Sequence, residues 1–133
     1  MNGTADQVLT VIALISIPTV MFGGHSLLRL LATEKLTDFQ KSFFRAGHAH
    51  AGVLLVMTLV ALDVAARAAL SANLTWTVGG LLLAGTLVQS GGMFIHMGVG
   101  QPGRWSWGNT VSSVGAVALA AGLLLLAWAV ATA

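Results

Sequence analysis

Four long runs of apolar residues, separated by short polar stretches, constrain this chain more than any other feature of its sequence. The runs cover about residues 8–31, 43–66, 76–99 and 111–131. Each is close to the roughly 20 residues that a helix needs to cross the hydrocarbon core of a bilayer. Because lipid offers the backbone no hydrogen-bond partner, helices are the form expected for all four runs. The sequence therefore predicts an all-α integral membrane protein, with residues 1–133 as a single transmembrane domain.

The composition supports the membrane class and excludes others. Only 8% of the residues are charged and 56% are hydrophobic, whereas roughly a quarter of the residues of a soluble domain are charged. The chain has no cysteine, which excludes disulfides and thiolate metal sites. It has no lysine-rich run or RNA-binding motif either, so nucleic acid is not an expected partner.

The connections between the runs predict the topology and the orientation. They are short, so neighbouring helices should run antiparallel in an up-down-up-down four-helix bundle, and Gly100-Gln101-Pro102-Gly103 should end the third helix. Most basic residues flank the first and third connections: Arg29, Lys35, Lys41, Arg45 and Arg104. Since basic loops stay in the cytoplasm, we expect an inner-membrane protein with both termini outside.

All four histidines fall at the basic, cytoplasmic end of this predicted bundle. His25 is late in the first helix, His48 and His50 are early in the second, and His96 is late in the third. An ionisable side chain inside a membrane span is costly and is usually functional. Taken singly, each histidine is as well explained by packing or by the membrane interface. The arrival of imidazoles from three helices at one depth favours a site.

Helix geometry distinguishes these residues. His48 and His50 are two positions apart and point about 200° away from each other, so one helix cannot aim both at one metal. Gln89, Met93 and His96 share a face of the third helix. Histidine is the commonest metal ligand and a frequent axial ligand of haem, and Arg45 lies where haem propionates reach the headgroups. Histidine and methionine together also suit copper.

A resemblance to a known family sharpens the haem interpretation. Residues 44–52, Phe-Arg-Ala-Gly-His-Ala-His-Ala-Gly, resemble the start of the second helix of the styrene oxide isomerases, where an aromatic-rich segment leads to Arg-Ala-His-x-Gly. His50-Ala51-Gly52 takes the His-x-Gly place. Residues 89–94 and 101–104 resemble a family stretch of small and aromatic residues followed by Pro-x-x-Gly-like breaks. The layout of four spans is similar over most of the chain.

The resemblance implies haem b, with His50 as axial ligand, in a homotrimer whose haem lies between subunits. It also implies that the iron acts as a Lewis acid and isomerises a small apolar epoxide, reached through the bilayer, to an aldehyde without net redox change. The family holds its substrate with an asparagine and a tyrosine. The corresponding positions here are Val56 and Phe94, neither of which can hydrogen-bond an epoxide oxygen.

His25 and His96 are additional to the family pattern, and they leave alternatives open. Either one is a candidate for the sixth position on the iron, which describes a bis-histidine b-type cytochrome that carries electrons. The histidines and methionines are also candidates for a copper site. In the remaining alternative, the chain is a packing subunit of a larger membrane complex and its histidines only form hydrogen bonds.

Overall fold

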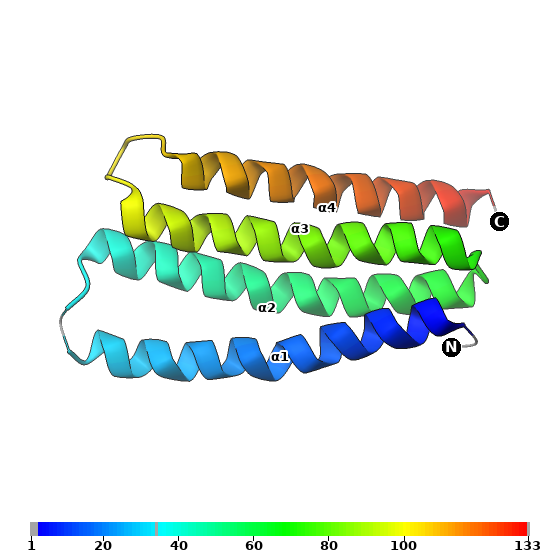
Figure 1. Ribbon diagram of the computed structural model, residues 1–133, viewed down its shortest axis with the longest axis horizontal. Coiled ribbons are helices and arrows are strands. Elements are labelled where there is room, and N and C mark those ends of the chain that lie inside the picture. Colours follow the sequence, from blue (N-terminus) through cyan, green and yellow to red (C-terminus); the bar gives the residue numbers. More distant parts are fainter. Residues whose placement is uncertain (1–2, 34, 133) are drawn as a thin grey trace.

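The computed structural model describes residues 3–33 and 35–132, which form four long helices. They are α1 (Thr4–Leu31), α2 (Asp38–Arg67), α3 (Ala72–Val99) and α4 (Trp107–Ala131). Each is long and apolar enough to cross a membrane, and the described residues contain no strand. Figure 1 shows the helices side by side, with both chain ends at the same end of the molecule. The predicted all-α class is confirmed, with four helices that are long and apolar enough to span a membrane.

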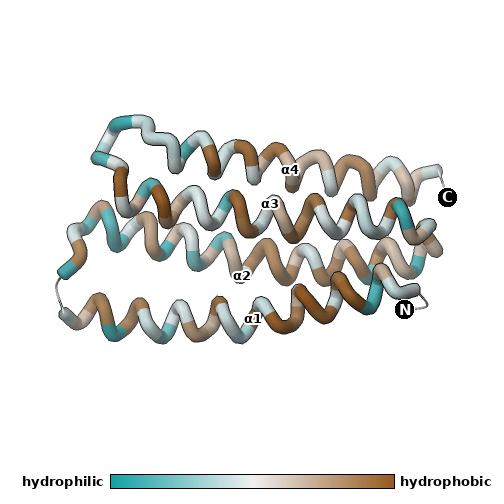
Figure 2. Tube along the Cα trace, in the orientation of Figure 1, coloured by the Kyte–Doolittle hydropathy of each residue, from teal (hydrophilic) through white to brown (hydrophobic). Residues whose placement is uncertain are grey.

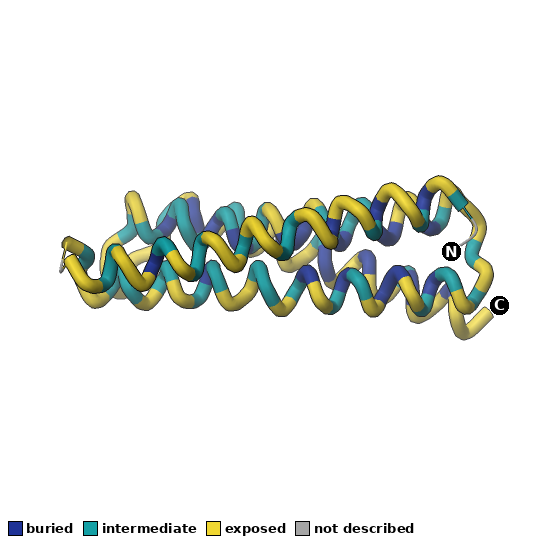
Figure 3. The backbone as a smooth tube through the Cα atoms, turned by 90° about the horizontal axis from the view of Figure 1, so that it is seen from below, coloured by how far each residue is buried: buried dark blue, intermediate teal, exposed yellow. Residues whose placement is uncertain are grey.

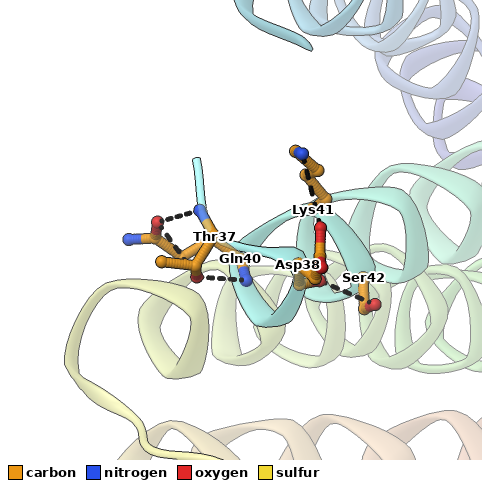
Figure 4. A network of polar contacts seen from close by, with 5 residues as sticks. All are labelled: Thr37, Asp38, Gln40, Lys41 and Ser42. Carbon is orange, nitrogen blue, oxygen red and sulfur yellow. Dashed lines mark hydrogen bonds and ion pairs between the residues drawn. The ribbon is translucent and has the colours of Figure 1, made fainter. Parts of the chain in front are cut away.

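Each helix begins four or five residues earlier than the apolar runs predict, whereas the helix ends agree to within one residue. The reason is that the first turns are polar. At the start of α2, Thr37 Oγ1 accepts from the Gln40 backbone N–H (3.2 Å) and the Gln40 side chain accepts from the Thr37 N–H (3.0 Å; Figure 4). Ser106 and Asn109 form the same capping box on α4. Such boxes satisfy backbone donors that begin a helix before its apolar residues do.

α3 and α4 form the closest pair in the structure, and glycines recurring every seven residues line their interface: Gly85 and Gly92 on α3, and Gly108, Gly115 and Gly122 on α4. A Cβ atom at Gly92 would collide with the backbone N of Ser112 and lie 2.7 Å from the Gly108 carbonyl oxygen. Across the same interface, the Ser112 hydroxyl donates to the Gln89 carbonyl (3.0 Å). The two helices therefore meet backbone to backbone, as small residues allow in membranes.

The other helices are attached by side chains. The buried cluster joins α2 to α3 and α4, and its members are Ala61, Ala65, Val78, Leu82, Leu119 and Leu126. α1 packs against α2 and α3, and within the described chain it shares no contact with α4. The molecule is therefore an open arrangement in which α1 and α4 lie at opposite sides (Figure 1).

Large apolar side chains cover the outside of the helices, as a membrane protein requires. Phe22 is 71% exposed, Leu87 74% and Leu124 71%. Figure 2 shows apolar residues along all four helices, and Figure 3 shows exposed positions on each of them. So continuous an apolar surface is not found on soluble monomers.

α1 is packed tightly only in its first half. Ala5, Leu9 and Ala13 are buried before Pro18, and Leu27 is the one buried residue after it. Proline has no N–H for the carbonyl four residues earlier, and its ring bends a helix. The ribbon of α1 changes direction near its middle (Figure 1). The second half of α1 is therefore the most loosely attached part of the bundle.

The connection between α3 and α4 confirms the predicted helix break. α3 ends at Val99, and the Arg104 backbone N–H donates to the Gln101 carbonyl (3.1 Å) to close a turn. Gly103 has φ +70°, and Pro102 precedes it. Proline followed by a residue of positive φ is typical of a type II turn, in which glycine is favoured at the second position.

The connection between α2 and α3 supplies a stability prediction. Ala69 has φ 51°, and the Leu70 N–H donates to the Ala65 carbonyl (3.2 Å), as in a Schellman motif. Because glycine adopts this conformation without strain, we expect Ala69→Gly to raise the free energy of unfolding by about 1 kcal/mol. Unfolding in detergent followed by circular dichroism measures this change. Ala68→Gly, next to it at φ −77°, serves as the control that should not stabilise.

Candidate functional site

The four histidines lie toward the end of the molecule that carries the α1–α2 and α3–α4 connections, but their surroundings differ. Within the residues that the structure describes, no three or more histidine and acidic side chains are grouped so that they could hold a metal ion. Although the histidines come from three helices, in the described residues they do not form a single site in which several of them surround one metal ion. Each imidazole has its own surroundings.

His50 is an exposed residue whose ring is held by its own helix. Its Nδ1 lies 2.8 Å from the Ala46 carbonyl oxygen. A carbonyl oxygen can only accept a hydrogen bond, so Nδ1 is the protonated nitrogen and Nε2 of the neutral ring keeps its lone pair. Metal-binding histidines usually donate their second ring N–H in this way. His50 therefore has both the orientation and the tautomer of a metal ligand.

The position of His50 on α2 follows from helical spacing. Phe43, His50 and Met57 are seven residues apart and share a face. The Phe43 ring contacts the His96 ring, and Met57 packs against the buried cluster. His50 thus lies on the face of α2 that is directed toward α3 and α4, and it remains exposed because α4 hardly reaches α2.

Two other residues predicted to bind the cofactor are Met93 on α3 and Arg45 on α2. A Cβ atom at Gly47, three residues before His50, would lie 3.3 Å from Met93 Cβ, so Met93 packs against this turn of α2. Arg45 is exposed five residues before His50. The structure thus brings Met93 to the turn of α2 that precedes His50, whereas Arg45, five residues earlier, leaves the helix about 140° around its axis from His50.

His48 is directed toward α1 instead. A Cβ atom at Gly24 would lie 2.6 Å from His48 Nε2, so the imidazole fills the space that glycine leaves. Gly52, one turn later, faces the same helix, because its Cβ would lie 3.9 Å from Val20 Cγ1. The prediction that His48 and His50 point in different directions is confirmed. The glycine of the His-x-Gly pattern therefore faces α1, with room for a Cβ atom.

His96 is buried, with 4% of its surface exposed. Its Nδ1 lies 2.7 Å from the hydroxyl of Ser106, the residue that caps α4. The rings of Phe39 and Phe43 meet the imidazole edge to face at centroid distances of 5.3 and 4.3 Å. His96 therefore ties the start of α2 and the start of α4 to α3, which is a structural task. His25, in contrast, is exposed on the loosely attached half of α1.

A cavity of about 500 Å³ lies between α1 and α3, and α2 also contributes to its lining. Its walls are almost entirely apolar. Phe94, predicted to line a distal pocket, is in its wall, and the Phe94 ring packs edge to face on Phe44 at 5.3 Å. Val56 is 55% exposed and does not line this cavity. Val56 and Phe94, which correspond to the two substrate-holding positions of the resembled family, therefore do not line the same cavity.

Ser90 lines the same cavity and was not singled out from the sequence. The residue is 5% exposed, and its hydroxyl has no hydrogen-bond partner within the described chain. The sequence signal was a lone serine beside Gly91 and Gly92 in an apolar span, which is a weak one. Ser106, as partner of His96, was missed as well, because ten residues and a turn separate the two.

Comparison with known proteins adds no relative. No protein family, no curated protein and no solved structure was found to match the chain.

Proposed function

We propose that this chain is an integral membrane protein that binds haem b through His50. The observation that carries the proposal is the 2.8 Å hydrogen bond from His50 Nδ1 to the Ala46 carbonyl, which leaves Nε2 free as a ligand atom. The residue is exposed on the face of α2 directed toward α3 and α4, where α4 hardly reaches α2, so its neighbours within one subunit do not block an approaching metal. His25 and His48 have no such hydrogen bond among the described residues.

The surroundings of His50 fit a haem macrocycle in character. Val53, about one turn later, is 68% exposed, which provides an apolar side chain beside the imidazole. Arg45 is exposed on the side toward the helix start, where a cation suits a propionate. Because this face is open within one subunit, a second copy is needed to enclose the group. We therefore include a homo-oligomer in the proposal, and the resemblance favours a trimer.

The arrangement in the membrane belongs to the same proposal. We propose an up-down-up-down antiparallel bundle in the inner membrane, with both termini outside and the histidine end toward the cytoplasm. Its support is the distribution of charge: Arg29, Lys35 and Lys41 lie around the α1–α2 connection and Arg104 in the α3–α4 connection. Only Arg67 is at the opposite end, where it pairs with Asp63 at 2.8 Å. Basic residues concentrate on the cytoplasmic side of membrane proteins.

The reaction that the resemblance implies is the isomerisation of a small apolar epoxide to an aldehyde. When bound, haem b supplies an iron atom that serves as a Lewis acid. The chain itself contributes the ligand, an apolar surface that excludes water, and access from the bilayer. Val56 and Phe94 carry no hydrogen-bonding group, so neither side chain orients a substrate oxygen. The haem site rests on His50, and the isomerase activity rests on the resemblance alone.

An absorption spectrum of the purified protein, with a haem assay, tests the proposal. We expect a Soret band and haem in amounts comparable to the protein. A colourless protein that takes up no added haem would contradict it, and copper found by metal analysis would favour the His/Met alternative. A low-spin six-coordinate spectrum would indicate the cytochrome with a second histidine. A five-coordinate spectrum, together with aldehyde formed from styrene oxide, would support the isomerase.

A further inference from the structure

A second pocket, of about 470 Å³, lies between the start of α2 and the α3–α4 connection, which Figure 1 shows at one end of the molecule. Aromatic rings form part of its wall, from Phe39 and Phe43 on α2 and Trp105 in the connection. None of the described residues that line it is acidic. Three of them carry hydrogen-bond donors: His96, Arg104 and Asn109.

His96 is the most buried of these three residues, and one nitrogen of its ring is free. Ser106 Oγ lies 2.7 Å from His96 Nδ1 and 3.4 Å from Asn109 Oδ1. Because the hydroxyl has a single hydrogen, it donates to the nearer acceptor, Nδ1, and the neutral ring then carries its own hydrogen on Nε2. A protonated ring carries a hydrogen there as well, so Nε2 is a donor in both states.

This Nε2 donor has no partner within the described chain, and it can still be reached. The side-chain atoms that are both fully buried and unpartnered among the described residues are Asp6 Oδ1 and Ser90 Oγ alone, so Nε2 of His96 keeps accessible surface. His96 is 4% exposed and borders the pocket. A donor on so buried a side chain is normally satisfied in folded proteins. We therefore expect a molecule in the pocket to provide the acceptor.

Asn109 and Arg104 add further donors to the same pocket. Asn109 Oδ1 accepts from the Ser106 backbone N–H (3.0 Å) in the capping box of α4, which identifies Nδ2 as the amino end of the side chain. Arg104 Nη1 donates to Gln101 Oε1 (3.2 Å), and a guanidinium has five N–H groups, so others stay available. Donors, one positive charge and the absence of carboxylates from the described lining suit an anion.

We infer that this pocket binds the phosphate group of an anionic phospholipid, and that His96 Nε2, Arg104 and Asn109 Nδ2 donate to its oxygens. Hydrogen bonds to a phosphate are charge-assisted and therefore strong. His96 and His50 differ in this respect, since His50 offers a lone pair at Nε2, which suits a metal, and His96 offers a hydrogen. Neither His50 nor haem takes part, so the inference stands or falls independently of the proposed function.

The position of the pocket favours a lipid over a soluble phosphate. Trp105 in its wall and Trp107 at the start of α4 are exposed, and tryptophan is enriched at the headgroup level of membranes. The Trp105 N–H donates to Thr110 Oγ1 (3.0 Å), so the indole contributes its apolar ring to the pocket. Basic pockets between transmembrane helices are known to bind anionic headgroups. The aromatic walls suit the glycerol and the first acyl carbons of such a lipid.

Native mass spectrometry of the full chain in detergent, titrated with phosphatidylglycerol, counts the bound lipids and measures their affinity. We expect one saturable site per chain. Phosphatidylcholine should bind more weakly, because its trimethylammonium group would meet Arg104. Inorganic phosphate at the same concentration should not displace phosphatidylglycerol. In histidine-selective ¹⁵N spectra, the Nε2–H resonance of His96 should shift as the lipid is added.

Asn109→Asp tests the site while the start of α4 is kept. The carboxylate retains the oxygen that accepts from Ser106, and it suits the first turn of a helix. It replaces the Nδ2 donor by a negative oxygen, so the affinity for phosphatidylglycerol should fall by about tenfold or more. Gln40→Glu is the matched control: Gln40 has the equivalent place in the capping box of α2 and lies outside the pocket, so its variant should bind like the parent.

Arg104→Gln separates the pocket from the general positive charge of this end. We expect it to weaken phosphatidylglycerol binding by about tenfold or more, as expected for lost hydrogen bonds to a charged group. Arg29→Gln removes the same charge from an exposed residue outside the pocket and should cost about fivefold or less.

The inference would be overturned by any of three results. One is unchanged affinity of Asn109→Asp while circular dichroism shows a folded protein. Another is an equal loss in Arg104→Gln and Arg29→Gln, which would indicate diffuse attraction of anionic lipid to this end of the molecule. The last is displacement of phosphatidylglycerol by an equal concentration of inorganic phosphate, which would assign the pocket to a soluble anion.

Discussion

Gly92→Ala is expected to be among the most destabilising single-methyl substitutions in this protein, lowering the free energy of unfolding by about 3 kcal/mol. The added Cβ would collide with the backbone of Ser112 on α4. A flexible side chain can move away from such a collision, but a helix backbone cannot. The two helices must therefore separate along their length, and the interface loses packing on both sides of the new methyl group. Unfolding in mixed micelles, followed by circular dichroism, measures the effect.

Gly91→Ala provides a matched control in the adjacent position. A Cβ at Gly91 meets nothing within 4 Å, and alanine is the better helix former. We expect the free energy of unfolding of this variant to stay within about 1 kcal/mol of the parent, on the stabilising side. Equal effects of the two substitutions would show that α3 and α4 are not in backbone contact at this level.

His50→Ala is expected to remove the Soret band of the purified protein, which is the largest functional effect predicted here. The substitution deletes the nitrogen that would bind iron, while an exposed histidine can be replaced at little cost to the fold. Added imidazole should restore part of the band, because it can occupy the space of the missing side chain and supply the same ligand atom. Spectra of matched amounts of protein, with and without imidazole, measure both effects.

His25→Ala is the control, since His25 is also an exposed histidine at the same end of the molecule. It should keep its haem. A shift from a low-spin to a high-spin spectrum in this variant would identify His25 as a second ligand. Full haem content in His50→Ala would contradict the assignment of the proximal ligand.

The number and the ends of the helices could be predicted from the sequence because they depend on local properties. A span has to match the bilayer thickness, and Gly100 and Pro102 stop α3 wherever it lies. The sequence predicts the helix starts too late, because hydropathy does not detect a capped polar turn such as the one from Thr37 to Gln40. The adjacent Gly91 and Gly92 are indistinguishable in the sequence, yet one faces open space and the other the backbone of α4.

The candidate site was only partly predictable for a related reason. The 3.6-residue period indicates that His48 and His50 diverge, but the rotation of α2 in the bundle decides which of them meets Gly24 of α1. The burial of His96 likewise depends on the rings of Phe39 and Phe43, which most of α2 and most of α3 separate from it in the sequence. Whether the Ser90 hydroxyl finds its usual carbonyl partner is a side-chain rotamer choice, which no sequence pattern specifies.

The cavity between α1 and α3 is open at the surface, since Ile15 and Leu87 in its walls are 66% and 74% exposed, and its width depends on how far these two helices can move apart. α3 cannot give way, because it is joined to α4 by contacts between backbones that leave no slack. α1 is joined by side chains, and beyond Pro18 its contacts are few: Leu27 is its one buried residue there, and the His48 ring packs against Gly24. The bend at Pro18 therefore makes the two walls different: α3 is the fixed wall, and the half of α1 beyond Pro18 is the wall that can move.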